Sequence, residues 1–276
     1  KLTEGADGVL ELITKVGQML IDGEGPTDPA TVSALRCADL HPLVKRLERN
    51  SSGEVILDAN GNPKEKLRNI ACGSPFLRLV GGGALEAIKD QRAASFSKDG
   101  LQLGTATDGG IELAGMVVQA NIECRPENTT VLLDVFNAFN QGSRKEAQIR
   151  KAENGFACEL HLMDFLYGGE PSDLHLKWTD EHGEQYDETL KSKRGGKQGC
   201  PSGGEEYSQL WHPVLRATYD EFSPQGLTVT GIADDTALQA KDAVVREAYA
   251  YLKKLLADGH TGLSLVDSKL RIYSES

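Results

Sequence analysis

Three short segments constrain the fold of this 276-residue chain more than the rest of its sequence. Residues 131–140 form an apolar strand pattern that ends in Asp134. Residues 194–203 form a glycine-rich turn that leads into an apolar helical pattern. Residues 230–236 form a strand that runs into the Asp234–Asp235 pair and out again. If the first and third segments are neighbouring strands, their carboxylates converge although they lie far apart in the sequence.

Carboxylates that converge at strand ends are typical of a site for divalent cations. Mg²⁺ prefers oxygen ligands and is usually held by one or two carboxylates together with substrate phosphates. Two such ions, about 3.5–4 Å apart, stabilise both the attacking and the leaving oxygen in phosphoryl transfer. Any one of these aspartates alone is more often a solvated strand end or hairpin tip. Their joint order and spacing favour Asp134, Asp234 and Asp235 as catalytic residues and metal ligands.

The apolar periodicity predicts an α+β fold in which helices flank an antiparallel sheet, because helices and strands alternate irregularly. An Asn60-Gly61 pair predicts a hairpin between residues 54–59 and 66–71. A second apolar-periodic stretch, after a first helix near residue 9, covers residues 31–47. The other predicted helices cover 74–96, 109–123, 143–153, 205–222 and 243–257, and the other strands 175–178, 185–190, 227–232, 263–265 and 269–273.

In this order and at these separations, the three segments resemble motifs A, B and C of reverse transcriptases. The resemblance implies that the three aspartates bind two Mg²⁺ or Mn²⁺ ions. It also implies that Phe139 lies under the nucleotide sugar and excludes a ribose 2′-hydroxyl. Gln198 and Gly199 match the residues that contact the incoming nucleotide and the template.

Further segments extend the resemblance to roughly residues 8–273. Residues 262–269 are similar to motif D, whose lysine, here Lys269, lies near the triphosphate. Residues 60–73 resemble the fingers hairpin, and Arg68 matches the arginine that binds the triphosphate. Stretches around Leu101 and Leu166 resemble non-LTR retrotransposon enzymes rather than retroviral ones.

The resemblance implies an RNA-directed DNA polymerase with a right-hand palm and fingers. Fingers and N-terminal helices are expected at 1–125, and a palm at 126–276 that includes a helix and hairpin insertion at 141–195. The implied partners are an RNA template, a DNA primer and dNTPs. A thumb is absent, so further domains such as a thumb or an endonuclease are expected outside this chain, which is then a truncated or decayed copy of a retroelement enzyme.

The pattern departs from the family at three places besides the thumb. Ile232 stands where motif C usually has Tyr or Phe, and Val266 stands where the motif D region usually has Asn. Asp58-Ala59 stand where a triphosphate-binding lysine is often found, which leaves that role vacant or assigns it to Lys64 or Lys66. None of these departures removes a predicted metal ligand.

Composition limits the other functions. The net charge of −11 argues against a self-sufficient nucleic-acid binder, although residues 191–197 form a local basic patch. No apolar run is long enough to span a membrane and no signal segment is present. Five cysteines without a CxxC pair predict buried thiols in a reducing compartment, and hence an intracellular protein, nuclear or cytoplasmic.

Two alternatives stay open. A catalytically inactive, reverse-transcriptase-like scaffold or RNA-binding domain fits the acidic charge and the missing thumb. Residues 203–207 (Gly-Gly-Glu-Glu-Tyr) resemble the signature of diguanylate cyclases, a remote alternative in which this signature forms a hairpin. Here it follows the glycine-rich turn and enters an apolar helical pattern.

Overall fold

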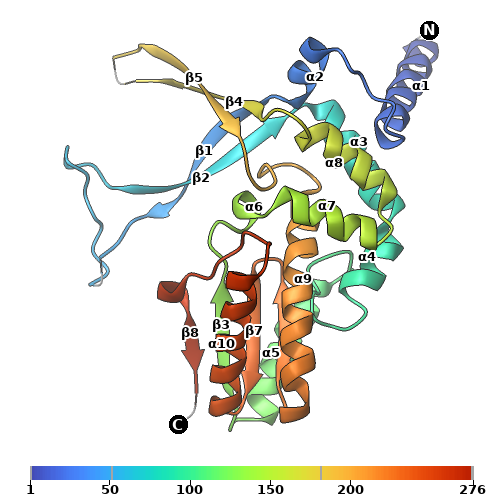
Figure 1. Cartoon of the computed structure of the whole chain (residues 1–276). Helices are drawn as coiled ribbons and strands as arrows, with labels where there is room; N and C mark the ends of the chain where they lie inside the picture. The colour runs from blue at the N-terminus through green and yellow to red at the C-terminus, as the bar shows by residue number, and fades with distance from the viewer. Residues whose placement is uncertain (1, 51, 181, 275–276) are drawn as a thin grey trace.

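Two four-stranded sheets organise the chain, and the computed structural model describes residues 2–50, 52–180 and 182–274. Sheet I has the strand order β2-β1-β4-β5 and sheet II the order β6-β7-β3-β8 (Figure 1). The strands are β1 (Ala38–Leu47), β2 (Glu65–Gly73), β3 (Thr129–Asp134), β4 (Ser172–Thr179), β5 (Gln185–Ser192), β6 (Thr228–Ile232), β7 (Asp235–Ala240) and β8 (Arg271–Tyr273).

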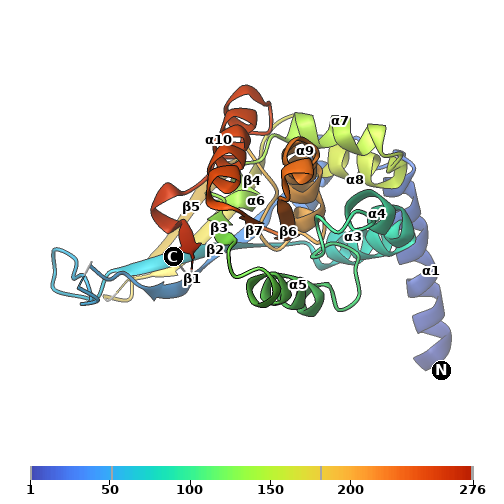
Figure 2. The ribbon, with the colours of Figure 1, turned by 90° about the horizontal axis from the view of Figure 1, so that it is seen from below.

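Helices cover both faces of sheet II. Figure 2 shows α9 and α10 on one face and α5 on the other. All three strand pairs of this sheet are antiparallel, which confirms the predicted α+β class. The helices are α1 (Leu2–Ile21), α2 (Pro29–Arg36), α3 (Pro75–Ala87), α4 (Lys89–Phe96), α5 (Gly110–Cys124), α6 (Ala138–Gln141), α7 (Arg144–Glu153), α8 (Ala157–Tyr167), α9 (Gly203–Phe222) and α10 (Asp242–Asp258).

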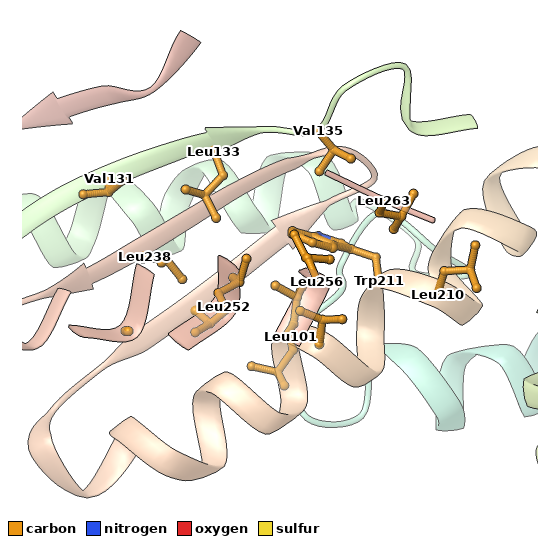
Figure 3. Packing of buried hydrophobic residues seen from close by; sticks show 14 of the residues in the cluster. Leu101, Val131, Leu133, Val135, Leu210, Trp211, Leu238, Leu252, Leu256 and Leu263 are labelled. Atoms are coloured by element: carbon orange, nitrogen blue, oxygen red, sulfur yellow. The ribbon is translucent and has the colours of Figure 1, made fainter. Parts of the chain in front are cut away.

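The main core lies between sheet II and the helix pair α9 and α10. Val131 and Leu133 of β3 are buried and point toward this layer, where they meet Trp211 and other apolar side chains (Figure 3). The Trp211 Nε1 donates a hydrogen bond to Thr236 Oγ1 at 3.0 Å. Because side chains alternate along a strand, Leu132 and Asp134 lie on the opposite face. The apolar alternation of β3 therefore directs Asp134 out of the core.

Sheet I combines strands that are distant in sequence. β1 pairs with β2 in antiparallel and with β4 in parallel orientation, through Ala38↔Leu174 and Leu40↔Leu176. The predicted hairpin of β4 and β5 is confirmed. It lies between the first two motifs in sequence and completes the sheet begun by residues 38–73.

Three of the predicted elements were wrong. Residues 263–265 form no strand, because Leu265 makes only an isolated bridge with Val135. The apolar stretch 31–47 is not one periodic element, because helix α2 ends at Arg36 and β1 begins at Ala38. Pro42 lies within the stretch, and a proline inside a helix removes a hydrogen bond and clashes with the preceding turn. Residues 54–59 form no ladder with β2; they make only isolated bridges such as Leu57↔Pro63.

Most of the other elements agree with the sequence. The predicted helix over 74–96 divides at Ile88 into α3 and α4. Ser143 caps α7 as predicted, since its Oγ accepts a hydrogen bond from the Glu146 N–H at 3.3 Å. Cys72 and Cys124 are exposed and the other three cysteines are only partly buried, so the prediction of buried thiols was wrong. In the described part of the chain, no helix is both long and apolar enough to cross a membrane.

Candidate functional site

The predicted carboxylates gather at one end of sheet II. In the β3–β7 ladder, Asp134 lies directly opposite Asp235, and Asp234 precedes Asp235 in the β6–β7 turn. Opposed residues of antiparallel strands have Cα atoms about 4.5–5.5 Å apart. Partial burial and the negative charges of Asp234 and Asp134 raise the pKa of Asp235. Residues 134 and 235 thus form the centre of the site, with Asp234 beside them.

A strained two-residue turn presents Asp234 and Asp235. Ile232 pairs with Asp235 across the hairpin, and Ala233 has a φ of +52°. A positive φ at the first turn position only is typical of type II′ hairpins, where the residue is usually glycine. An alanine in this region stores strain that the surrounding structure must hold.

Residues 101–104 pack beside this turn and form backbone hydrogen bonds with β6. The Leu103 N–H donates to Gly231 O and the Gly231 N–H donates to Leu101 O, both at 2.8 Å. A Cβ on Gly104 would lie 2.8 Å from the Ala233 nitrogen, so a glycine is required there. The segment noted in sequence analysis near Leu101 therefore supports the hairpin of the site.

Lys269 occupies the open side of Asp134. Its Nζ lies 2.5 Å from Asp134 Oδ1, and both side chains are about one-third exposed (35% and 32%). The short 3₁₀ turn that carries it (Asp267–Lys269) is held to α10, because Tyr249 Oη and Lys253 Nζ both donate to the Asp267 carboxylate. Lys269 thus lies beside the carboxylates and forms an ion pair with Asp134.

The donor chemistry suits a hard divalent cation, since carboxylate oxygens are the ligands that Mg²⁺ prefers. After burial, the negative charges of Asp234 and Asp134 raise the pKa of Asp235. A bound cation relieves such repulsion. The arrangement is not a finished ligand set: among the described residues, no group of three or more His, Cys, Asp or Glu side chains is placed to hold a metal ion. The positive charge next to Asp134 comes from the ammonium group of Lys269.

Five cations surround the opposed carboxylates. A cavity of about 480 Å³ is lined by Asp134 and Asp235 and by the side chains of Lys45, Arg46, Lys66, Lys269 and Arg271. The chain as a whole carries a net charge of −11, whereas the residues that line this cavity include more cations than carboxylates. Such a cavity can bind a polyanion next to the carboxylates, because lysine and arginine form charge-assisted hydrogen bonds with phosphates.

Lys45 lines the carboxylate cavity although no motif in the sequence indicates it. The ladder between β1 and β2 shifts register between Val44 and Arg46, and Lys45 lies at this bulge. Bulges redirect side chains near active sites, and the Lys45 charge lowers the pKa of Asp235 against the larger raising effects. Lys45 thus lines the cavity beside Asp235, as Lys66 does, whereas Lys64 pairs with Glu48. Proline at position 42 was the available signal that this stretch is not helical.

Arg68 and Lys66 lie on the same face of β2, because they are two residues apart on a strand. Lys66 lines the carboxylate cavity and Arg68 is exposed one step farther along. A second cavity of about 520 Å³ shares Arg46 and Lys66 with the first and continues to Arg49. The lining of this second cavity is mixed, because Glu48 lies among its cations.

Phe139 is brought to the site by the glycine-rich loop. The Gly196 N–H donates to Phe139 O at 2.7 Å, and a side chain at Gly195 would clash with the same carbonyl. The Phe139 ring lies 5.8 Å from the Tyr207 ring. Burial, followed by the charges of Asp234, Asp235 and Asp134, raises the pKa of Tyr207. Tyr207 therefore contacts Phe139 and is near enough to the carboxylates to interact with their charges.

Gln198 and Gly199 join the site to sheet I. The Ala71 N–H of β2 donates to Gln198 O at 2.7 Å. Gly199 has a φ of +118°, and a Cβ there would lie 2.6 Å from Ala71 O. The loop is thus fixed by its backbone along β2.

The predicted basic patch at 191–197 is only partly a surface feature. Lys197 is buried, and its Nζ donates to the carbonyl of Arg36 at the end of α2. Burial lowers the pKa of Lys197 to about 8. Lys191 is paired with Asp173 at 2.5 Å. Lys197 is a structural tie between the loop and α2, whereas Lys193 and Arg194 are exposed.

Comparison with known proteins shows a distant likeness of fold. No protein-family model matches the chain, and no curated protein matches it in sequence. Telomerase from Candida albicans, in complex with a TWJ fragment of telomeric RNA, has 10% identity and a TM-score of 0.55, with 88% of this chain and 43% of that chain covered. Apo telomerase from Candida tropicalis, truncated from its C-terminal domain, has 9% identity and a TM-score of 0.55, with 88% and 51% covered.

The Candida tropicalis telomerase bound to a TWJ fragment has 10% identity and a TM-score of 0.56, with 87% of this chain and 41% of that chain covered. The chain therefore shares an α+β fold with these telomerases over most of its length. It spans about half or less of the length of each of them.

Proposed function

We propose that this chain is the palm and fingers of a reverse transcriptase, which transfers nucleotides from dNTPs to a primer 3′-hydroxyl on an RNA template. One observation carries the proposal: the opposed carboxylates Asp134 and Asp235 share a cavity with five cations. That combination suits a substrate with a triphosphate and a divalent counter-ion. The shared fold supports it, because telomerases are specialised reverse transcriptases.

In this proposal Asp134, Asp234 and Asp235 hold two Mg²⁺ or Mn²⁺ ions. When bound, these ions stabilise the attacking and leaving oxygens of the transfer. Lys269 leaves Asp134 when the site is loaded and joins Lys45, Arg46, Lys66 and Arg271 around the triphosphate. Arg68 is placed to bind the same polyanion as it enters.

The remaining partners follow from the same proposal. The RNA template and DNA primer lie along sheet I and the β6–β7 hairpin, and Gln198 and Gly199 contact the incoming nucleotide and its template base. The non-LTR retroelement type remains part of the proposal. So do further domains such as a thumb or an endonuclease, which would supply much of the duplex binding that an acidic chain lacks.

The direct test is primer extension. The purified chain is incubated with a DNA primer on an RNA template, dNTPs and either Mg²⁺ or Mn²⁺, and the products are resolved by length. We expect extension that requires both the template and the divalent ion. Template-independent addition, or no extension with either ion, would contradict the proposed activity.

Replacing Phe139 by alanine is expected to weaken discrimination against ribonucleotides. The ring lies against Tyr207 beside the carboxylates, where its bulk would meet a 2′-hydroxyl. Steric discrimination of this size is worth about 10–200-fold. The measurement is the ratio of rNTP to dNTP incorporation, with the exposed Phe136→Ala as matched control. An equal ratio in Phe139→Ala and wild type would remove the gate assignment.

The Lys269–Asp134 ion pair also favours a second candidate, an inactive reverse-transcriptase-like scaffold. A lysine that stays on Asp134 neutralises that carboxylate without any metal ion. A rise in melting temperature on addition of Mg²⁺ or Mn²⁺ distinguishes an active site from such a scaffold. The cyclase alternative loses its structural basis, because Gly203 to Tyr207 begin helix α9 and form no hairpin.

A further inference from the structure

Sheet I has one apolar face that follows from its register. Leu40 lies beside Ala71 of β2 and Leu176 of β4, so these three side chains share a face. Alternation then places Val44, Leu67, Leu174, Trp178, Tyr186 and Leu190 on this face. The opposite face carries polar and charged side chains, among them His41, Lys66, Arg68, His175 and Lys177.

The part of this apolar face nearest the helices is covered, and the distal part is exposed. Ala38, Leu40 and Ala71 are buried together with the partly buried Leu174 and Leu176. Farther out, the strands continue as two ribbons, β1–β2 and β4–β5 (Figure 1). On the β4–β5 ribbon the apolar side chains of Trp178, Tyr186 and Leu190 are between 38% and 44% exposed, with Leu190 at the outer edge opposite Leu174. On the separate β1–β2 ribbon, Leu67 and Val44 are 51% and 53% exposed.

An aromatic pair lies near the outer end of the β4–β5 ribbon. The rings of Trp178 and Tyr186 are stacked, with centroids 4.9 Å apart and planes 9° from parallel. Tryptophan and tyrosine are rigid, amphipathic side chains that are enriched where proteins bind one another. Contiguous exposed apolar side chains rimmed by polar residues are typical of an interaction surface.

The charges on and around this face are negative. The charged strand residues on it, within the described part of sheet I, are Glu65 and Glu188. At the hairpin tip, Tyr186 Oη donates to both Asp180 and Glu184. The cations of the β4–β5 hairpin lie on the other face, where Lys177 pairs with Asp187 and Lys191 with Asp173.

We propose that this face of the β4–β5 ribbon, formed by Trp178, Tyr186 and Leu190, docks a basic amphipathic helix of a partner protein. An apolar stripe flanked by lysine or arginine matches apolar side chains bordered by carboxylates. A nucleic acid or an anionic membrane would face the same carboxylates with like charge. A second copy in a two-fold dimer would bring identical acidic rims together, because such an interface uses the same patch twice.

Binding at this face can be measured through the fluorescence emission of Trp178. The chain has two tryptophans, and the other, Trp211, is fully buried. The probe is a short synthetic helix of leucine and lysine with one apolar stripe, and the control peptide has glutamate in place of lysine. We expect the basic peptide to shift the Trp178 emission to shorter wavelength at saturation, and the acidic peptide to produce no shift.

Matched variants locate the binding. Leu190→Glu on the apolar face should weaken binding of the basic peptide at least about tenfold, because it removes an apolar side chain from the proposed contact. Leu43→Glu is the control, because Leu43 is 54% exposed on the opposite face of the same sheet. Near-ultraviolet circular dichroism checks that both variants fold.

Other outcomes overturn the proposal. Equal loss in Leu190→Glu and Leu43→Glu, or equal binding of both peptides, would show that no specific basic helix is recognised there. A wild-type dimer that Leu190→Glu converts to a monomer would assign the face to a second copy. Loss of RNA or anionic-vesicle binding in Leu190→Glu alone would assign it to those ligands.

Discussion

Replacing Asp134 by asparagine is expected to lower the rate of primer extension at least about a thousandfold, because each 1.36 kcal/mol of lost transition-state stabilisation is a factor of about ten. The substitution keeps the size of the side chain and removes the charge that faces Asp235 and Lys269. Under the proposed function it removes an oxygen ligand of the metal site. The measurement is single-nucleotide incorporation with Mg²⁺ or Mn²⁺ over a range of concentrations.

Asp258→Asn is the matched control, because Asp258 is an exposed aspartate at the end of α10. It should leave incorporation within about twofold of wild type, as expected for surface substitutions away from special features. Unchanged incorporation in Asp134→Asn would remove the catalytic assignment. If wild type is inactive and Mg²⁺ raises its melting temperature no more than that of Asp134→Asn, the scaffold alternative replaces the enzyme.

Replacing Lys151 by methionine is expected to lower the free energy of unfolding by about 3–5 kcal/mol, the usual cost of removing one partner of a buried ion pair. Lys151 and Glu159 are both 0% exposed, and Lys151 Nζ lies 3.3 Å from Glu159 Oε2. Two more buried glutamates, Glu205 and Glu206, lie close enough to interact with this charge. Without the lysine, the buried carboxylates keep less positive charge to balance them.

Urea unfolding measures this effect, and two further variants interpret it. Lys145→Met changes an exposed lysine of the same helix, α7, and should alter stability by less than about 0.5 kcal/mol. The double variant Lys151→Met and Glu159→Leu should recover most of the loss, because an apolar replacement leaves no unpaired charge. A cost below about 1 kcal/mol in Lys151→Met would show that the pair is solvated in solution.

The carboxylate pair could be predicted because local patterns determine it. Alternation along β3 buries Val131 and Leu133 and leaves Asp134 on the other face. The Asp234–Asp235 turn follows an apolar strand in the same way. The pairing of β3 with β7 places Asp134 opposite Asp235, and no local sequence pattern predicts this pairing. The family resemblance supplied that step.

The rest of the site depends on contacts between residues that are distant in sequence, which no local pattern predicts. Lys45 enters the cavity through a bulge in a strand that was predicted as part of another periodic stretch. The parallel pairing of β1 with β4 joins strands that lie far apart in the sequence, and no local pattern in either strand indicates its partner. The Lys269–Asp134 ion pair depends on the Asp267 contacts with α10, which appear only after folding.

The division of sheet I between two distant parts of the chain has a consequence for synthesis on the ribosome. β1 and β2 are complete once residue 73 is made, but β4 begins only at residue 172. At about 5–20 residues per second, roughly 5–20 s pass before the parallel partner of β1 emerges. During this interval Ala38 and Leu40 lack the neighbours that bury them. A nascent chain halted before β4 should therefore be the form of this protein that chaperones bind most strongly.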